Sequence, residues 1–158
     1  MIAKSSALVL DNFCVVNTKC VAIPPKAENP NFNPIEVTES FPVNIEFEIE
    51  KEENSENHRI IVTIEINNKA EFDGGYSILA EGIGFFSFDK KNTLEEKTKA
   101  QLLQVSALSI CISNLRLYIA NLTSYYPWGS FSFHAVDMGE LLKEKAEFIE
   151  NNKSKKEV

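Results

Sequence analysis

The stretch NLRLYIANLTSYYPWGSFSF, residues 114–133, decides the fold because it contains the end of a long apolar segment. A capping pattern at Thr93 and Glu96 precedes this segment, and it predicts a helix from about residue 94 to Ser124 that stops before Pro127. Apolar side chains cover nearly every face of its second half, whereas a helix lying on one sheet needs a single apolar stripe. We therefore expect this helix to pack against a sheet on one side and against another subunit on the other.

Four segments upstream of the helix have strand patterns: residues 8–23, 41–49, 60–66 and 76–88. The second and third alternate between apolar and polar side chains, which is typical of strands with one buried face. The third continues this pattern towards Phe72. The four segments together predict a sheet of four strands.

Turn-forming residues separate these strands. Asp73-Gly74-Gly75 predicts a tight hairpin, which makes the two strands that flank it antiparallel. Glycines at positions 82 and 84, inside the last strand, predict a bulge or a bend. The Asn- and Pro-rich connection at residues 24–34 predicts no regular element.

Beyond the long helix, residues 130–136 are expected to be extended, and Asp137 with Glu140 repeats the capping pattern at the start of a second helix that runs through Ile149. The whole order predicts an α+β fold. Its four-stranded antiparallel sheet is packed with a long helix and a second C-terminal helix. We expect residues 1–150 to form a single domain and residues 151–158 a flexible charged tail.

The charge of the chain argues against two classes of partner. The formal net charge is −7, and nucleic-acid binding requires a basic face that replaces phosphate counterions. The same charge disfavours docking on anionic lipid. The apolar segment 102–122 approaches the length of a membrane span, but the polar residues within it are costly in hydrocarbon. We therefore expect a buried helix rather than membrane insertion.

The three cysteines, Cys14, Cys20 and Cys111, have neither the number nor the spacing of a zinc or redox motif. The short apolar run near the N-terminus lacks the pattern of a signal peptide. These features predict a reduced, cytoplasmic protein whose thiols act as small hydrophobic groups.

No catalytic constellation is evident in the sequence. Neither His58 nor His134 is associated with a nucleophile or with a metal-binding pattern. The acidic row of Glu46, Glu48 and Glu50 has the period of a strand and is explained by a solvated strand face. We therefore expect no enzyme activity, no metal and no cofactor.

Aromatic residues are the distinctive feature of the chain. The sequence Tyr125-Tyr126-Pro127-Trp128-Gly129 lies where the long helix ends, in a loop where burial of every ring is difficult. Exposed apolar patches of this kind mark interaction surfaces, and rings supply a large contact area at a modest cost in entropy. The loop therefore predicts a surface that binds apolar segments of other chains.

These features resemble the SecB-type protein-export chaperones over nearly the whole chain. The glycine- and phenylalanine-rich strand end at residues 84–87 is similar to that of the family, and Arg116 corresponds to the arginine that ends an apolar half-helix in the family. The resemblance implies an ATP-independent holdase that binds unfolded polypeptides in apolar grooves between the second helix, the crossover segment and the sheet. It also implies a homotetramer that is a dimer of dimers.

The resemblance and the aromatic pattern together lead to two sets of predicted site residues. Those predicted to bind the client polypeptide are Phe47, Tyr125, Tyr126, Trp128, Phe131, Phe133, Met138, Leu141 and Leu142. Those predicted to form the oligomer interface are Ile112, Arg116 and Ile119.

The sequence also departs from the family pattern. Residues 135–138, Ala-Val-Asp-Met, stand where the family has Pro-x-Asn-Phe, and Leu79 occupies the acidic position that contacts the translocase ATPase. The tail at 151–158 has no evident counterpart of the basic and zinc-mediated contacts of that partnership. Three functions thus remain open besides a general export chaperone: a dedicated chaperone of an antitoxin in a toxin–antitoxin module, a carrier of small hydrophobic ligands, and an enzyme.

Overall fold

The protein is described here by a computed structural model that covers residues 2, 5–26, 31–53, 55–69, 72–89, 91 and 93–154. It confirms the predicted α+β fold class with four strands, a long helix and a C-terminal helix. The elements are β1 (Leu8–Ala22), α1 (Pro34–Glu39), β2 (Val43–Lys51), β3 (His58–Ile66), β4 (Tyr76–Phe88), α2 (Glu96–Gln101), the π-helical turn η1 (Leu102–Ala107), α3 (Leu108–Thr123) and α4 (Met138–Ser154).

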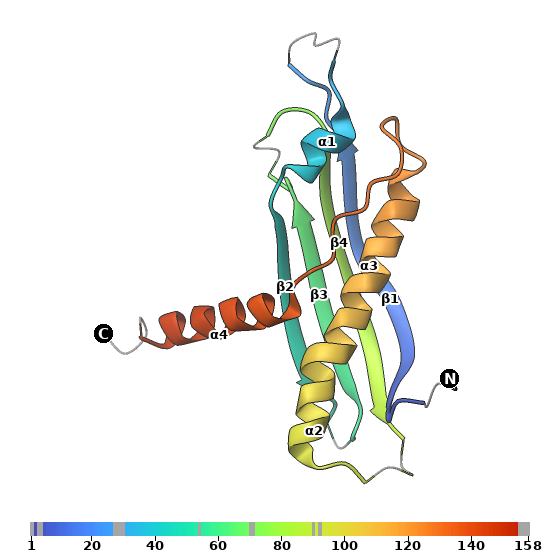
Figure 1. The fold of residues 1–158 in the computed structure, drawn as a ribbon, viewed down its shortest axis with the longest axis vertical. Coiled ribbons are helices and arrows are strands. Elements are labelled where there is room, and N and C mark those ends of the chain that lie inside the picture. The colour runs from blue at the N-terminus through green and yellow to red at the C-terminus, as the bar shows by residue number, and fades with distance from the viewer. Residues whose placement is uncertain are drawn as a thin grey trace.

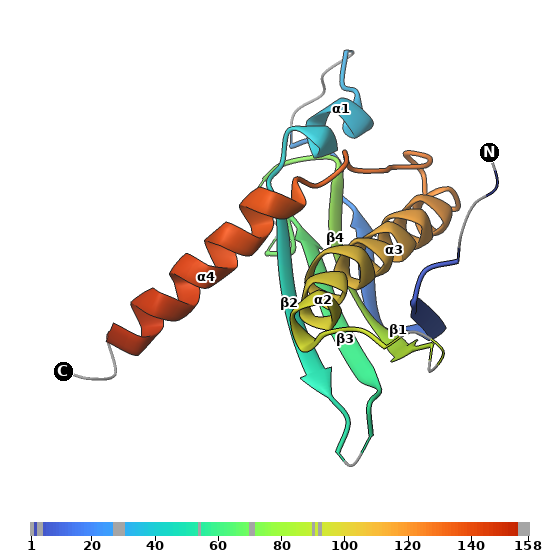
Figure 2. The same cartoon turned by 60° about the horizontal axis from the view of Figure 1, so that its bottom comes forward.

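The sheet has the strand order β1-β4-β3-β2, and all neighbouring strands are antiparallel. The continuous helix formed by α2, η1 and α3 crosses one face of this sheet, while α1 lies at one end (Figure 1). The fourth helix, α4, leaves the sheet beside β2 and projects away from the rest of the molecule (Figures 1 and 2).

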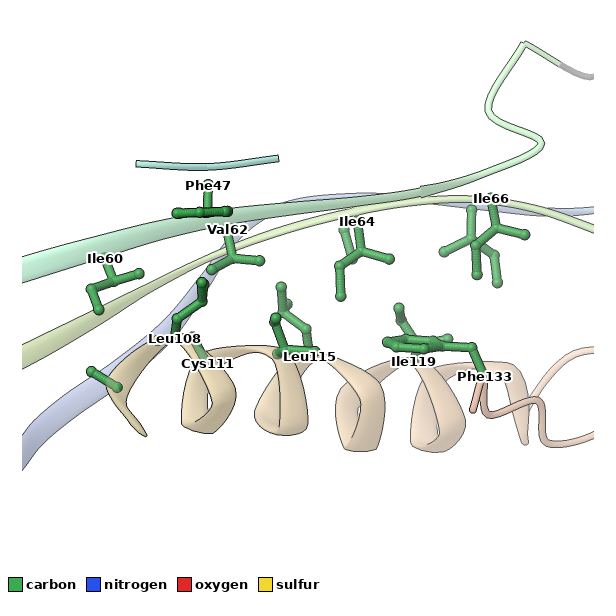
Figure 3. Packing of buried hydrophobic residues seen from close by; sticks show 14 of the residues in the cluster. Phe47, Ile60, Val62, Ile64, Ile66, Leu108, Cys111, Leu115, Ile119 and Phe133 are labelled. Carbon is green, nitrogen blue, oxygen red and sulfur yellow. The ribbon is translucent and has the colours of Figure 1, made fainter. Parts of the chain in front are cut away.

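The core lies between α3 and the sheet, and it follows from the alternation along β3. The side chains of Ile60, Val62, Ile64 and Ile66 are fully buried and point towards α3 (Figure 3). Residues of α3 meet them from the other side, and burial of such an aliphatic side chain contributes about 1.5–3 kcal/mol. The apolar α3 residues with no exposed surface are Leu108, Cys111, Leu115 and Ile119. Helix 96–123 is long and apolar enough to cross a membrane, but its apolar stripe packs on the sheet of its own chain.

The glycines of β4 allow close approach and do not form the predicted bulge. The register shifts lie in β1, between Leu10 and Asn12 and between Val15 and Asn17, and β4 pairs with β3 without a shift. A Cβ atom at Gly84 would lie 2.5 Å from Cys111 Sγ, and real Cβ atoms do not approach a neighbour so closely. Of the two predicted alternatives, a bulge within β4 was wrong, because the extra residues lie in β1. The absence of a Cβ at Gly84 instead lets α3 lie close to the sheet.

A short helix, α1, begins at Pro34, the last residue of the connection predicted to be irregular, and continues through residues 35–39, for which no element was predicted. Asn33 caps it, since its Oδ1 accepts hydrogen bonds from the backbone N–H groups of Ile35 and Glu36, and Pro34 occupies the first turn. This combination is a common start of a helix, so the sequence contained a signal that the prediction missed. The Thr38 hydroxyl then fastens α1 to β4 by accepting a hydrogen bond of 2.8 Å from Tyr76 N.

The two predicted helix starts have opposite outcomes. The capping box at Thr93 is not formed, because the long helix begins at Glu96 with Glu95 as its N-cap and without a side-chain cap. The cap at Asp137 is confirmed, since its Oδ1 accepts hydrogen bonds from Gly139 N at 2.9 Å and Glu140 N at 3.1 Å. Helix α4 continues to Ser154, and residues 155–158 of the predicted tail lie outside the described residues.

The connection between β3 and β4 is also longer than predicted. Strand β3 ends at Ile66 and β4 begins at Tyr76, so the two antiparallel strands, as far as the structure describes them, are not joined by a tight hairpin. The two glycines have the positive φ angles that their place in a turn requires, +78° at Gly74 and +70° at Gly75.

The limits of the predicted single domain, residues 1–150, remain a prediction.

Candidate functional site

Helix α4 is the least embedded long element of the described chain. None of its residues from 138 to 151 is buried. Its apolar side includes Leu141 and Leu142, which are half-buried, and Phe148 and Ile149, which are 57% and 44% exposed. An amphipathic helix usually buries its apolar stripe, so α4 presents an apolar surface towards β2 that the chain does not itself fill.

Three adjoining hollows lie between β2, the segment after α3 and α4. Their volumes are about 520, 180 and 590 Å³, and the middle hollow shares Ile45 and Leu141 with the first and Phe47 with the third. We refer to them together as the α4 groove. Its lining residues are Thr38, Glu39, residues 43–50, Gln104, Phe131, residues 133–137, residues 140–142, residues 144–146, Phe148 and Ile149.

The α4 groove has an apolar floor and an acidic rim. Its one basic lining residue, Lys145, donates a hydrogen bond of 3.1 Å to Glu46 Oε2 and lies 5.3 Å from the ring centroid of Phe47. The remaining charged residues of the lining are acidic: Glu39, Glu46, Glu48, Glu50, Asp137, Glu140 and Glu144. This distribution favours a ligand that carries both apolar and positively charged groups.

The structure brings five of the predicted client-binding residues together in the α4 groove. Leu141 and Leu142 reach it from α4 as half-buried side chains. Phe47, Phe131 and Phe133 belong mainly to the hydrophobic core, with exposures of 8%, 1% and 5%, and they line the groove with the little surface that remains. The predicted residue Met138 packs against the core and is not a lining residue.

The remaining predicted aromatic residues lie elsewhere, in the loop after α3. The Tyr126 hydroxyl donates to Cys20 O at 3.1 Å, and the Tyr76 hydroxyl donates to Gly129 O at 2.8 Å. Trp128 packs edge-on against Phe32 with ring centroids 6.1 Å apart, whereas Tyr125 is 89% exposed. None of Tyr125, Tyr126 and Trp128 lines the α4 groove. The hydroxyls of Tyr126 and Tyr76 instead fasten this loop to β1 and β4.

Thr123 sets the path of the chain from this loop to the α4 groove. Its hydroxyl donates to Ile119 O at 2.7 Å and accepts from Phe131 N at 2.8 Å, and its side chain is fully buried. This double hydrogen bond holds Phe131 against the core and directs the following residues along β2 towards α4.

The predicted oligomer interface needs a correction. Ile112 and Ile119 face the sheet and are 5% and 0% exposed, so they fill the core of the single chain and leave no surface for a partner. Arg116 is half-buried. The apolar residues that the long helix does expose are others, namely Val105, Ile110 and Leu117, with exposures of 41%, 36% and 62%.

Sequence reasoning also missed several residues of the α4 groove. Val43, Ile45 and Ile49 line it from β2, and Lys145 and Ile149 line it from α4. The alternation of apolar and polar residues could have identified the three β2 residues, but the prediction assigned their apolar face to the core alone. The amphipathic pattern of α4, an apolar stripe with a polar opposite face, could have identified Lys145 and Ile149.

Two of the three cysteines, Cys20 and Cys111, are embedded thiols with raised pKa values. Burial raises the pKa of Cys111 to about 12 and that of Cys20 to about 11, so both thiols are neutral near pH 7 and poor nucleophiles. Within the described residues, no group of three or more His, Cys, Asp or Glu side chains is arranged to hold a metal ion.

The arrangement of the elements is found in a known protein. A Mycobacterium tuberculosis SecB-like chaperone, Rv1957, solved in complex with a ChAD peptide from the Rv1956 HigA1 antitoxin, superposes with a TM-score of 0.53. The match covers 83% of this chain and 91% of that one at 13% sequence identity. The chain has a SecB-like fold. At this identity the likeness concerns the fold alone.

Other comparisons add little to the SecB-like fold. A Streptococcus agalactiae protein of unknown function covers 80% of this chain and 96% of its own at 9% identity, with a TM-score of 0.38 that is too low to support an argument. No protein-family model matches the sequence, and no curated protein matches it.

Proposed function

We propose that the protein is an ATP-independent holdase that binds unfolded or non-native polypeptides in the α4 groove. The observation that carries this proposal is the apolar side of α4, which has no buried residue among those described. Leu141 and Leu142 pack against the edge of the core but stay half-buried, and together with Phe148 and Ile149 they border the hollows beside β2. Such a surface suits weak binding of many apolar segments. The proposal includes a cytoplasmic location and no enzyme activity.

The first test is aggregation of a slowly refolding model protein, with and without this chain, in the absence of nucleotide. We expect suppression at a near-stoichiometric ratio, and we expect Phe148→Ser to weaken it several-fold, because Phe148 lines the α4 groove and is 57% exposed. Tyr125→Ser is the matched control, since Tyr125 is 89% exposed but lies outside the groove. Equal effects of the two substitutions would place client binding elsewhere.

A dedicated antitoxin chaperone is the second candidate, and one comparison favours it. The SecB-like chaperone of M. tuberculosis was solved with a peptide from an antitoxin. If this chain acts in the same way, it should bind a particular antitoxin segment far more tightly than a denatured model protein. Equal affinity for both would favour a general holdase. A role of that holdase in protein export would in addition require binding to the translocase ATPase.

Slow exchange of an apolar dye without any effect on aggregation would favour a small-ligand carrier.

We also propose a homo-oligomer, a tetramer built as a dimer of dimers, that covers the exposed apolar side of the long helix. Ile110 and Leu117 support this because they lie seven residues apart on the side of α3 opposite the buried Leu115, and both are exposed, as is Val105 in the preceding turn. Leu117→Asp should reduce the mass measured by light scattering. A mass unchanged by this substitution would exclude Leu117 from the interface.

A further inference from the structure

Strand β2 is an edge strand whose backbone is available for pairing. It is the last strand in the sheet order and pairs with β3 from Val43 to Lys51 without a register shift. In the part of the chain that the structure describes, the backbone of residues 43–51 makes no hydrogen bond outside this ladder. Alternate N–H and C=O groups of β2 therefore face outwards without a protein partner.

The α4 groove runs along this edge and not along one face of the sheet. Successive residues of a strand point to opposite faces, so a hollow on one face is lined by every second residue. The first hollow is instead lined by the consecutive residues 43–46, the middle one by 45–47 and the third by 47–50. This lining places the groove beside the outward-facing backbone groups of β2.

We propose that a client segment binds in the α4 groove as an extended strand added to the edge of β2. The proposal rests on the proposed holdase function and specifies how that function recognises a polypeptide. Cross-strand neighbours share a face of the sheet. Client residues opposite Ile45, Phe47 and Ile49 therefore lie on the apolar side, and those between them lie beside the acidic row. The segment that fits best alternates apolar residues with Lys or Arg.

The acidic row also makes a second copy of the chain a poor occupant. Glu46, Glu48 and Glu50 occupy alternate positions on β2. Glu46 is paired with Lys145 and Glu50 with Arg59, whereas Glu48 has no ion pair among the described residues. Pairing of two β2 strands would place two such rows, each with an uncompensated Glu48, on the same face. Like charges that face each other across strands are destabilising. A basic client segment gains from the same charges, so the row selects against self-pairing and for a cationic strand.

The test uses three synthetic nine-residue peptides with the same alternating sequence of valine and lysine. One is unmodified, one is N-methylated at every second amide, and one at the intervening amides. Only one edge of a bound strand bonds to β2, so we expect one methylated peptide to lose at least tenfold in affinity and the other to bind like the unmodified peptide. Equal binding of both methylated peptides, or equal loss by both, would overturn strand addition.

A charge exchange gives an independent readout. Glu48→Lys should weaken binding of the valine–lysine peptide several-fold, and a peptide with glutamate in place of lysine should then bind the variant better than the wild type. No reversal of preference would overturn the role of the acidic row. If the unmodified peptide fails to bind while aggregation is still suppressed, strand addition is wrong and the holdase function survives. Loss of both activities would overturn the two proposals together.

Discussion

Helices α3 and α4 both carry apolar side chains, but the two helices differ in how deeply these side chains are buried. Six residues of α3 are buried, and Figure 3 shows Leu108, Cys111, Leu115 and Ile119 facing the side chains of β3. No described residue of α4 is buried, and the helix projects beyond β2 (Figure 2). The long helix already occupies the one sheet face that the described chain covers, so the apolar side of α4 is left to border a groove. A helix therefore needs free sheet surface, besides an apolar stripe, to join a core.

Substitutions can test this difference between α3 and α4, and the largest effect on stability is expected at the centre of α3. Leu115→Ala should lower the free energy of unfolding by about 2–5 kcal/mol, because Leu115 is fully buried and its truncation leaves a cavity. Urea unfolding measures the loss. Leu117→Ala, two residues further on the same helix, is the control. At a protein concentration low enough to dissociate the proposed oligomer, it should cost far less, because that side chain is 62% exposed in the single chain. Similar losses at both positions would contradict the assignment of the two faces.

A second substitution probes how closely α3 approaches the sheet. Gly84→Ala should lower the free energy of unfolding by about 1–3 kcal/mol, since the added Cβ would lie 2.5 Å from Cys111 Sγ and 2.7 Å from Phe86 Cε2. Adding Cys111→Ala removes the sulfur and should recover part of the loss in a double-mutant cycle. Purely additive effects would show that the glycine is not required for this contact.

On α4 the effect should fall on binding and not on stability. Leu141→Ser should weaken client binding about tenfold, which corresponds to about 1.4 kcal/mol, because Leu141 lines two hollows of the α4 groove. It should lower the urea midpoint far less than Leu115→Ala does, since Leu141 is only half-buried against the core and α4 contributes no buried residue among those described. The affinity is measured with a fluorescent unfolded client. A large fall in stability without weaker binding would make α4 a core element like α3.

The smallest effect is expected at His58, near the start of the long helix. Its ring packs edge-on against Phe88, which also lies beneath the Lys99 ammonium. Burial, and then the positive charge of Lys51, lower the pKa of His58 below its ordinary value of 6.5. The folded chain therefore binds this proton less readily than the unfolded chain does, and the stabilising contribution is complete above pH 6.5 and lost as the pH falls through the lowered pKa.

The measurement for His58 is the melting temperature between about pH 7.5 and about pH 5.5, a range that spans the ordinary histidine pKa, for the wild type and for His58→Gln. We expect the wild type to lose slightly more stability over this range than the variant, because the variant has no imidazole to protonate. Parallel curves for the two proteins would show that the burial of His58 does not affect stability in this range.

Local patterns in the sequence predict much of the fold correctly. The alternation of β2 and β3 and the cap at Asp137 concern residues close together in sequence, and each was predicted and confirmed. The same local reasoning placed the rings of the 125–129 loop and the residues of α4 on one binding surface. The structure separates them, because the hydroxyls of Tyr76 and Tyr126 bond to backbone carbonyls far away in sequence.

The sequence by itself therefore determined the strands, the two longer helices and the apolar character of the site. Only the tertiary structure decided which apolar residues fill the core and which remain available to a partner. Ile112 and Leu117 are equally apolar in sequence, but one faces the sheet at 5% exposure and the other is 62% exposed. The physical reason is that periodicity fixes a side chain relative to its own element, whereas burial depends on where the other elements come to lie.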